Sequence, residues 1–194
     1  MRLRLVKEPF DDREYLFELK LDGFRAIVYL ENGQCRLVSR NLKNLSFESL
    51  KKALAKLPVQ DAILDGEIVC LDANGVSQFN QLLSRKGEPV FYAFDLLWHN
   101  GADLRQLSLV QRKSRLQLLI REGKCLRLLY AQHIVQDGKR FFEEICSRDL
   151  EGVVAKHRNG VYKDDGIDWL KMKNPHYSQA EGRHELLTRR RVHP

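Results

Sequence analysis

A lysine between two carboxylates lies near the start of the chain, where Glu18, Lys20 and Asp22 alternate with apolar residues. If this segment is a strand, the three polar side chains share one face and the apolar residues between them face a core. A lysine amine becomes a nucleophile once it is deprotonated, which requires burial or nearby positive charge. The two carboxylates alone would oppose this, so other cations must be supplied. Gly23 allows a tight turn after the strand, and Arg25 can then place its guanidinium near a bound phosphate.

The segment K-L-D-G-F-R at residues 20–25 resembles the K-x-D-G-x-R nucleophile motif of the covalent nucleotidyltransferases. These are the ATP-dependent DNA ligases, the RNA ligases and the mRNA capping enzymes. The resemblance implies that Lys20 attacks the α-phosphate of a nucleotide, expels pyrophosphate and holds the nucleotide as a phosphoramidate. A motif this short also arises by coincidence. The alternative is a solvated lysine at a strand end, before an Asp-Gly turn.

Further segments match motifs of the same superfamily in the same order. They are S-R-N at 39–41, L-D-G-E-I-V at 64–69, F-Y-A-F-D-L-L at 91–97, E-G-V-V-A-K at 151–156 and W-L-K-M-K at 169–173. Together these motifs are spread over nearly the whole of residues 8–174, which excludes a chance match. The residues of these motifs are most similar to those of bacterial end-joining DNA ligases of the ligase D type.

The resemblance implies a role for one residue in several of these motifs. Arg40 would approach the nucleotide, and Glu67 would meet the ribose or the metal shell. Phe94 would stack on adenine, since its ring offers a flat apolar surface. The expected nucleotide contacts are completed by Glu18, Arg25 and Lys156.

Physical reasoning supports the expected catalytic residues, which are Lys20, Asp22, Lys171 and Lys173. Lys171 and Lys173 are two residues apart in a predicted strand, so both amines can enter one pocket. Two cations there would stabilise the charge that develops on an α-phosphate and lower the pKa of Lys20.

Two glutamates are the expected metal ligands. Glu67 and Glu151 provide the hard oxygen atoms that Mg²⁺ or Mn²⁺ prefers. Such an ion would neutralise charge during in-line transfer of a phosphoryl group. The sequence therefore predicts ATP and Mg²⁺ (or Mn²⁺) as cofactors.

Each of these residues also has a simpler interpretation when it is taken alone. Phe94 alternates with apolar neighbours, as a core aromatic residue does. The two glutamates resemble ordinary surface carboxylates, and Lys171 and Lys173 resemble an exposed strand face. These interpretations fail because all of them would have to coincide in the order of one superfamily.

Composition limits the class of protein. The 194 residues, 43% of them hydrophobic, are enough for one domain with a substantial core. No apolar run approaches the ~18 residues of a membrane span, and the amino terminus lacks a signal peptide, so we expect a cytoplasmic protein. The four cysteines form no C-x-x-C pair, which predicts reduced thiols that are mostly in the core. The six histidines lack the spacing of metal ligands, and zinc is not expected.

The net charge of +7 lies in the second half of the chain. Residues 1–100 hold 14 acidic and 14 basic residues, whereas residues 101–194 hold 12 acidic and 19 basic ones. A basic face would attract the phosphates of duplex DNA. The candidates are Arg112, Lys113 and Arg115 on a predicted helix, and Arg189 to Arg191 near the end of the chain. An ordinary solvated face is an equally good interpretation of the helix.

The apolar spacing predicts a mixture of strands and helices. Strands are predicted near 15–20, 24–30, 34–39, 62–71, 90–98, 126–130, 152–156 and 168–173, and helices near 46–57, 78–84, 108–122 and 137–147. This pattern predicts an α+β domain. The resemblance implies two antiparallel sheets flanked by helices, the ATP-grasp-like adenylation fold of the ATP-dependent DNA ligases, with the nucleotide between the sheets.

We therefore expect a nucleotidyltransferase (adenylation) domain at 1–174 and a basic tail at 175–194. Ligases of this type continue into an OB-fold, and the tail is too short to form such a barrel. The predicted function is that of a minimal ATP-dependent DNA ligase module. Lys20 would take AMP from ATP and pass it to the 5′-phosphate of nicked or broken duplex DNA, for nick sealing in DNA repair. We expect a monomer, with other repair proteins supplying the OB-type function.

Two alternatives stay open at this point. One is an RNA ligase or a capping-type transferase, which shares the lysine motif. The other is a non-catalytic module that binds nucleotide or DNA ends in a repair complex.

Overall fold

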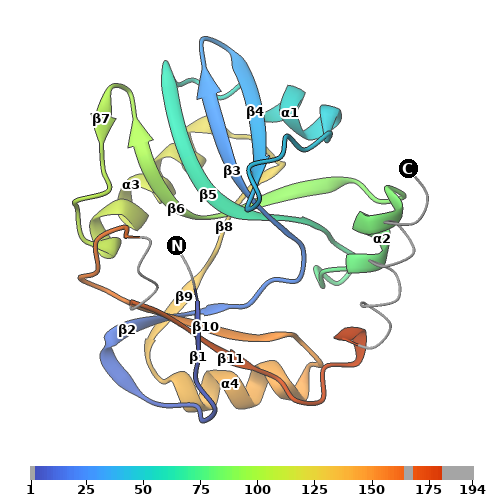
Figure 1. Cartoon of the computed structure of the whole chain (residues 1–194), viewed down its shortest axis with the longest axis vertical. Coiled ribbons are helices and arrows are strands. Elements are labelled where there is room, and N and C mark those ends of the chain that lie inside the picture. The colour runs from blue at the N-terminus through green and yellow to red at the C-terminus, as the bar shows by residue number, and fades with distance from the viewer. Residues whose placement is uncertain (1–2, 164–167, 181–194) are drawn as a thin grey trace.

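The computed structural model describes residues 3–163 and 168–180, which form two β-sheets with helices on their outer faces (Figure 1). Sheet A has the strand order β1-β11-β10-β2-β9. Its strands are β1 (Arg4–Leu5), β2 (Asp12–Leu19), β9 (His133–Gln136), β10 (Gly152–His157) and β11 (Trp169–Lys173). All pairs in this sheet are antiparallel except β1 with β11.

Sheet B has the strand order β4-β3-β5-β6-β7, and β8 pairs with β6 outside that path. Its strands are β3 (Phe24–Glu31), β4 (Gln34–Ser39), β5 (Asp61–Cys70), β6 (Pro89–His99), β7 (Ala102–Asp103) and β8 (Leu128–Tyr130). The β6–β8 pair is parallel and the others are antiparallel. The expectation of an α+β fold with two mostly antiparallel sheets is confirmed.

Within the described part of the chain, four α-helices and one short 3₁₀ helix accompany the sheets. They are α1 (Glu48–Leu54), α2 (Phe79–Ser84), α3 (Leu109–Gly123), α4 (Gly138–Ser147) and η1 (Ser178–Ala180). Helices α1 and α3 pack on sheet B, and α4 packs on sheet A. In Figure 1 sheet B lies above sheet A, with α4 at the bottom of the molecule. The two sheets therefore face each other across the middle of the molecule.

Each sheet buries one face in its own core. In sheet A, Phe17, Val153 and Leu170 pack in a cluster with Ile145 of α4. Because side chains alternate along a strand, the neighbours of these residues point to the other face, between the sheets. Glu18, Val154 and Lys171 form one row across β2, β10 and β11 on that face. The cores thus fix which residues face the cleft.

A second cross-strand row lies on sheet B. The alternation of β3 sends Ala26 and Val28 into the core beneath α1 and α3. Arg25 therefore faces the opposite side, where it pairs in register with Glu67, which in turn pairs with Tyr92. The two sheets place their polar rows toward each other.

Most predicted elements are present, with shifted ends. The predicted first strand ends at Leu19, so Lys20 lies just beyond it, and the helix predicted at 46–57 covers only Glu48–Leu54. Strands β1, β7 and β9 were not predicted. The expectation that the cysteines are mostly in the core is confirmed in part, because Cys35 and Cys125 are partly buried and pack against the core that holds Cys70. All four are free, as expected, but only Cys70 is buried.

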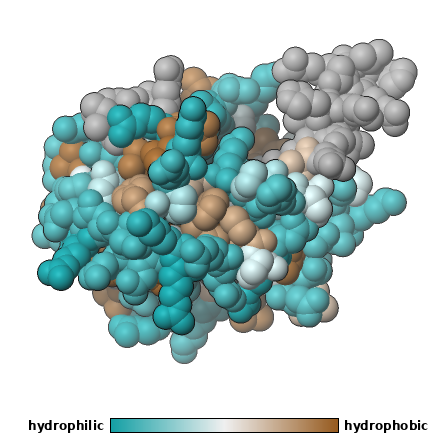
Figure 2. Space-filling model, turned by 90° about the horizontal axis from the view of Figure 1, so that it is seen from below, coloured by the Kyte–Doolittle hydropathy of each residue, from teal (hydrophilic) through white to brown (hydrophobic). Residues whose placement is uncertain are grey.

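The surface is predominantly hydrophilic on the side of sheet A and α4. Figure 2 shows hydrophilic side chains around a smaller group of apolar ones near the middle of this face. Among the described residues, no helix has the length and apolarity needed to cross a membrane. Arg189 to Arg191, the predicted basic tail segment, lie outside the described residues.

Candidate active site

A cavity of about 60 Å³ lies between the two sheets and gathers six of the residues predicted to handle nucleotide. These are Glu18, Lys20, Arg25, Glu67, Phe94 and Lys156. The rest of the wall is apolar and comes from Leu3, Leu19, Leu21, Ala131, Val154 and Trp169. Motifs that are far apart in the sequence therefore meet at one place.

Lys20 points into this site and forms an ion pair there. Its Nζ lies 2.7 Å from Oε1 of Glu151, and its side chain is only 18% exposed. Its backbone N–H donates to the carbonyl of Gly152, at 2.9 Å. A side chain at Gly152 would collide with the Met172 carbonyl. The absence of a side chain there lets the β10 backbone, which holds Lys20, approach β11.

The turn after Lys20 differs from the prediction. Asp22 is buried and does not line the cavity, and its carboxylate accepts a hydrogen bond from the Tyr177 hydroxyl at 2.9 Å. Leu21 lines the cavity rather than the core. Gly23 is required because a side chain there would collide with the Ile68 carbonyl of β5. The reason for this glycine is a close approach between strands rather than the tight turn that the sequence indicated.

Glu18 lies at the base of the cavity between two lysines. Its two carboxylate oxygens lie 2.6 Å from the ammonium groups of Lys113 and Lys156. Burial by itself would raise the pKa of Glu18, but the two lysines outweigh burial and lower it. Burial, together with repulsion from Lys113, lowers the pKa of Lys156 to about 8. Glu18 is therefore an ionised carboxylate in a water-poor site.

Lys113 was not predicted as a site residue, and its assignment to a DNA-binding face is wrong. Lys113 and Arg112 are both buried, and the guanidinium of Arg112 donates to both carboxylate oxygens of Asp95, at 2.7 and 2.9 Å. Only Arg115 of the three candidates is exposed. The spacing in the sequence could have indicated that both residues are buried. Positions 112 and 113 lie three and four residues after Leu109, on the face of α3 that packs into the core.

Arg25 lines the cavity, but its guanidinium fork is engaged by a carboxylate. Nε and Nη2 donate to the two oxygens of Asp65 at 3.1 and 2.6 Å, and the Tyr162 hydroxyl donates to the same carboxylate at 2.7 Å. Burial would lower the pKa of Arg25, but the charge of Asp65 outweighs it and raises the pKa. Asp65 and Tyr162 belong to this site and were not predicted.

Phe94 lies in the cavity wall as expected, although its ring already has partners. The Lys156 ammonium lies 4.1 Å from the ring centroid, and the Arg25 guanidinium lies 5.6 Å from it. The ring also meets Trp169 edge-on, with centroids 5.6 Å apart. The ring on which a base is expected to stack is therefore surrounded by two cations and a second aromatic ring.

The two expected metal ligands lie near Lys20. Burial raises the pKa of Glu67 to about 8, the charge of Glu151 adds to this rise, and Lys20 and Arg25 oppose it. Within the described residues, no group of three or more His, Cys, Asp and Glu side chains could hold a metal by itself. Mg²⁺ usually takes one or two carboxylates and completes its shell with phosphate and water. Glu67 and Glu151 therefore fit an ion that binds together with a nucleotide.

The remaining predicted cations surround the cavity without lining it. Burial lowers the pKa of Lys171, and the positive charges of Lys173, Lys20 and Arg40 lower it further. Lys173 and Arg40 are exposed. Arg40 lines a neighbouring groove of about 550 Å³ together with Arg25. The structure thus brings Lys20, Lys173 and Arg40 within electrostatic range of Lys171.

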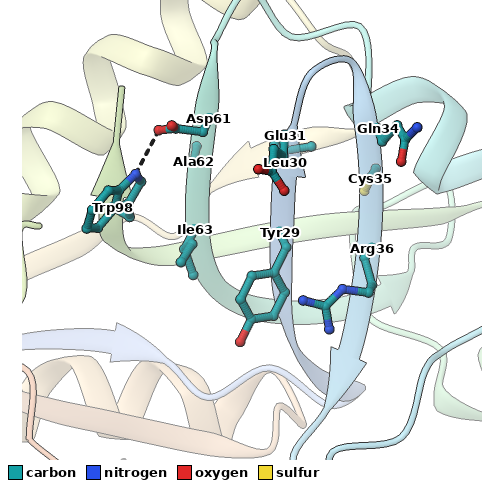
Figure 3. A pocket seen from close by; sticks show the side chains of 10 residues that line it. All are labelled: Tyr29, Leu30, Glu31, Gln34, Cys35, Arg36, Asp61, Ala62, Ile63 and Trp98. Carbon is teal, nitrogen blue, oxygen red and sulfur yellow. Dashed lines mark hydrogen bonds between the residues drawn. The ribbon is translucent and has the colours of Figure 1, made fainter. Parts of the chain in front are cut away.

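A second surface groove, of about 390 Å³, lies further along the same face of sheet B (Figure 3). Arg36, Tyr29, Ile63 and Trp98 form a row across β4, β3, β5 and β6. The Arg36 guanidinium lies 4.2 Å from the Tyr29 ring centroid. The indole N–H of Trp98 donates to Asp61 at 2.7 Å. This groove holds none of the predicted site residues, so the smaller cavity is the better candidate for chemistry.

The fold and the residues gathered between its sheets define a nucleotidyltransferase domain of the adenylation type. The family model described as ATP dependent DNA ligase domain matches residues 4–173. The chain therefore belongs to the ATP-dependent DNA ligase domain family, which is a family of enzymes. The predicted resemblance is confirmed, and the family supports the DNA ligase interpretation over the RNA ligase and capping alternatives.

Individual relatives agree with this assignment. The multifunctional non-homologous end joining protein LigD of Pseudomonas aeruginosa is 36% identical over 177 residues, which cover 87% of this chain and 21% of that protein. The SPbeta prophage-derived DNA ligase-like protein LigB of Bacillus subtilis is 29% identical over 189 residues, which cover 93% of this chain and 68% of that protein. The chain therefore spans about a fifth of the length of this LigD relative.

Solved structures show the same fold. The ligase domain of M. tuberculosis LigD superposes with a TM-score of 0.77 and 28% identity, covering 89% of this chain and 58% of that chain. A mycobacterial DNA ligase D complexed with ATP and MES superposes with a TM-score of 0.75 and 28% identity, covering 89% of this chain and 60% of that chain.

Proposed function

We propose that this chain carries out the nucleotidyl transfer chemistry of an ATP-dependent DNA ligase. Lys20 attacks the α-phosphate of ATP, so that an N–P bond forms, the bond to the bridging oxygen breaks and pyrophosphate leaves. The AMP then passes to a DNA 5′-phosphate, and an adjoining 3′-hydroxyl displaces it. The observation that carries this proposal is that Lys20 and five other predicted site residues, contributed by four motifs far apart in the sequence, line one cavity.

The ion pair with Glu151 holds the nucleophile in place before reaction. Attack requires the Lys20 amine to leave this pair and lose its proton. Lys171 lies within electrostatic range of both Lys20 and Arg40, so positive charge gathers on this side of the site. The same charges stabilise the negative charge that develops on the α-phosphate.

Glu67 and Glu151 are the residues that would hold Mg²⁺ in this reaction. When bound, the ion supplies charge neutralisation for the triphosphate. This role suits Glu67, because a further cation, in addition to Lys20 and Arg25, favours the ionised form of its buried carboxyl.

Glu18 can distinguish adenine from guanine in the bound nucleotide. An ionised carboxylate only accepts hydrogen bonds, so it can pair with the exocyclic amino group of adenine. Guanine has a carbonyl oxygen at that position, which the carboxylate would repel. Because Lys113 and Lys156 keep Glu18 ionised, the site favours ATP over GTP. This charge distinguishes the proposed reaction from that of a capping-type transferase.

The cavity must widen before a nucleotide enters. Its volume of about 60 Å³ is below the roughly 300 Å³ at which small-molecule sites begin. Phe94 and Trp169, which pack edge-on against each other, both line it. Binding is therefore coupled to the separation of these side chains.

We also propose broken or nicked duplex DNA as the substrate and DNA end joining as its setting. The names of the LigD relatives, which describe non-homologous end joining, support this setting. A net charge of +7 supports binding to a polyanion. Other repair proteins would act with this chain.

Intact-mass measurement after incubation with ATP and Mg²⁺ tests the first step. We expect the native protein to gain the mass of one AMP and the folded Lys20→Ala variant to gain none. Competition between ATP and GTP, and between nicked DNA and nicked RNA, tests the specificity. A folded protein that forms no adduct but binds DNA in a salt-sensitive, nucleotide-independent way would be a binding module instead.

A further inference from the structure

The segment that follows β11, residues 174–180, connects the two sheets. The Asn174 amide donates to the Leu150 carbonyl at 3.0 Å, and the Ser178 backbone N–H donates to Asp149 at 2.8 Å. The Gln179 amide donates to the Ser77 carbonyl in the loop after β5, at 3.3 Å. In Figure 1 this segment lies at the lower right, beneath α2. It is therefore part of the folded domain, although the sequence predicted a tail from residue 175.

Tyr177 is the buried residue at the centre of this segment. Its side chain is 6% exposed, and its hydroxyl donates to the Asp22 carboxylate at 2.9 Å. Asp22 is 3% exposed and lies two residues after Lys20. A buried hydrogen bond to a carboxylate is among the stronger ones, because the acceptor is charged and water is excluded.

Three contacts among the described residues hold the turn that carries Lys20. On one side the Lys20 backbone N–H donates to Gly152. On another, Gly23 lies against the Ile68 carbonyl of β5. The third contact is the hydrogen bond from Tyr177 to Asp22. Because Lys20 lies beyond the end of β2, these contacts replace the regular ladder that would hold a strand residue.

We propose that Tyr177 is a positioning residue for Lys20, acting through Asp22. The proposal rests on the proposed function. The segment that carries Tyr177 also bonds to Asp149 and Leu150, the two residues before Glu151. One short segment thus fixes both the nucleophile turn and the loop of the carboxylate that pairs with Lys20. Loss of the Tyr177 hydroxyl should disturb the alignment of Lys20 without removing any group that contacts nucleotide.

Single-turnover adenylation of the Tyr177→Phe variant tests this proposal. Phenylalanine keeps the buried ring and removes the hydroxyl that donates to Asp22. We expect lysyl-AMP formation at saturating ATP to slow roughly ten- to a hundredfold, because small misplacements of a nucleophile are costly. We expect the ATP dissociation constant, measured separately, to change by less than about twofold. A role in folding alone would not produce this division between rate and affinity.

Tyr15→Phe is the matched control, because Tyr15 lies in β2 with its ring against Phe10 and His157, away from the cavity. It removes a tyrosine hydroxyl from the same sheet and should adenylate at the native rate. Combining Tyr177→Phe with Asp22→Asn adds a second comparison. If Tyr177 acts through Asp22, the double variant should be little slower than the slower single variant.

The possible outcomes separate this proposal from the proposed function. A native rate in Tyr177→Phe, a parallel loss of rate and ATP affinity, or additive effects with Asp22→Asn would each overturn the positioning role while native adenylation stands. A folded native protein that forms no adduct would overturn the proposed function, and the positioning role with it.

Discussion

Lys113 and Glu18 are 95 positions apart in the chain and form a buried ion pair at 2.6 Å beside the candidate nucleotide cavity. The lysine comes from α3, which packs on sheet B, and the glutamate comes from β2 of sheet A. The pair therefore joins the two halves of the fold at the base of the site. It also sets the charge of the carboxylate that faces the cavity.

The stability of the protein should depend on this ion pair. Lys113→Met keeps much of the side-chain volume but leaves Glu18 with Lys156 as its remaining lysine partner. We expect a loss of about 3–5 kcal/mol in the free energy of unfolding, as for other broken buried pairs. Urea unfolding followed by circular dichroism measures it. Arg115→Met, on the exposed face of the same helix, should change the value by less than about 0.5 kcal/mol. Equal effects of the two substitutions would refute the structural role of Lys113.

Selection of adenine should depend on Glu18. In Glu18→Gln the carboxylate becomes an amide, which both donates and accepts hydrogen bonds and so tolerates a guanine carbonyl. We expect the preference for ATP over GTP in adduct formation to fall about tenfold or more. Competition between the two labelled nucleotides measures the preference. An unchanged preference in a folded variant would mean that other groups read the base.

The stability of the protein should respond to pH through Glu67. Its pKa is raised in the folded protein to about 8 from 4.5, so the folded state retains a proton that the unfolded state has lost. The stability that this proton provides is fully present below about pH 4.5 and is lost as the pH rises through about 8. Glu67→Gln stays neutral at every pH. Its stability relative to the native protein should therefore increase by a few kcal/mol between about pH 5 and pH 9.

Urea unfolding of both proteins at several pH values measures this difference. Glu88→Gln, an exposed carboxylate in the loop before β6, serves as the control and should follow the native protein. A difference between Glu67→Gln and native protein that is constant with pH would contradict the raised pKa.

The paired lysines of β11 should contribute unequally to adenylation. Lys171 is half-buried and lies within the electrostatic range of Lys20, whereas Lys173 is exposed and screened by water. We expect Lys171→Ala to slow lysyl-AMP formation roughly a hundredfold and Lys173→Ala to slow it by a smaller factor. Quenched-flow measurement at saturating ATP compares the two. The reverse order would place the phosphate nearer to Lys173.

Short-range sequence patterns predicted the elements whose own residues show a strand or helix periodicity. Strand alternation and motif wording located the main strands and six residues that line one cavity. They could not locate β1, whose two residues pair with β11 more than 160 positions later. Such pairing depends on tertiary contacts that no local pattern records. The same limit explains why Asp65, which holds Arg25 across two strands, was missed.

Charge was the least reliable guide to the site. A charged residue predicts an exposed face only when it has no buried partner, and Arg112 and Lys113 meet theirs in β6 and β2. Tyr177 was missed for a different reason. It lies beyond the last family motif, in a segment without helical or strand periodicity, and only the folded chain brings it to Asp22.

The narrowness of the cavity between the sheets has a consequence for affinity. If the closed arrangement predominates in solution, the measured dissociation constant for ATP equals the intrinsic constant divided by the fraction of molecules that are open. A substitution that destabilises the closed arrangement, such as replacement of Trp169 by a smaller residue, would raise the open fraction and so tighten apparent ATP binding. The same substitution would slow the transfer step. Affinity and turnover would then move in opposite directions under the same change.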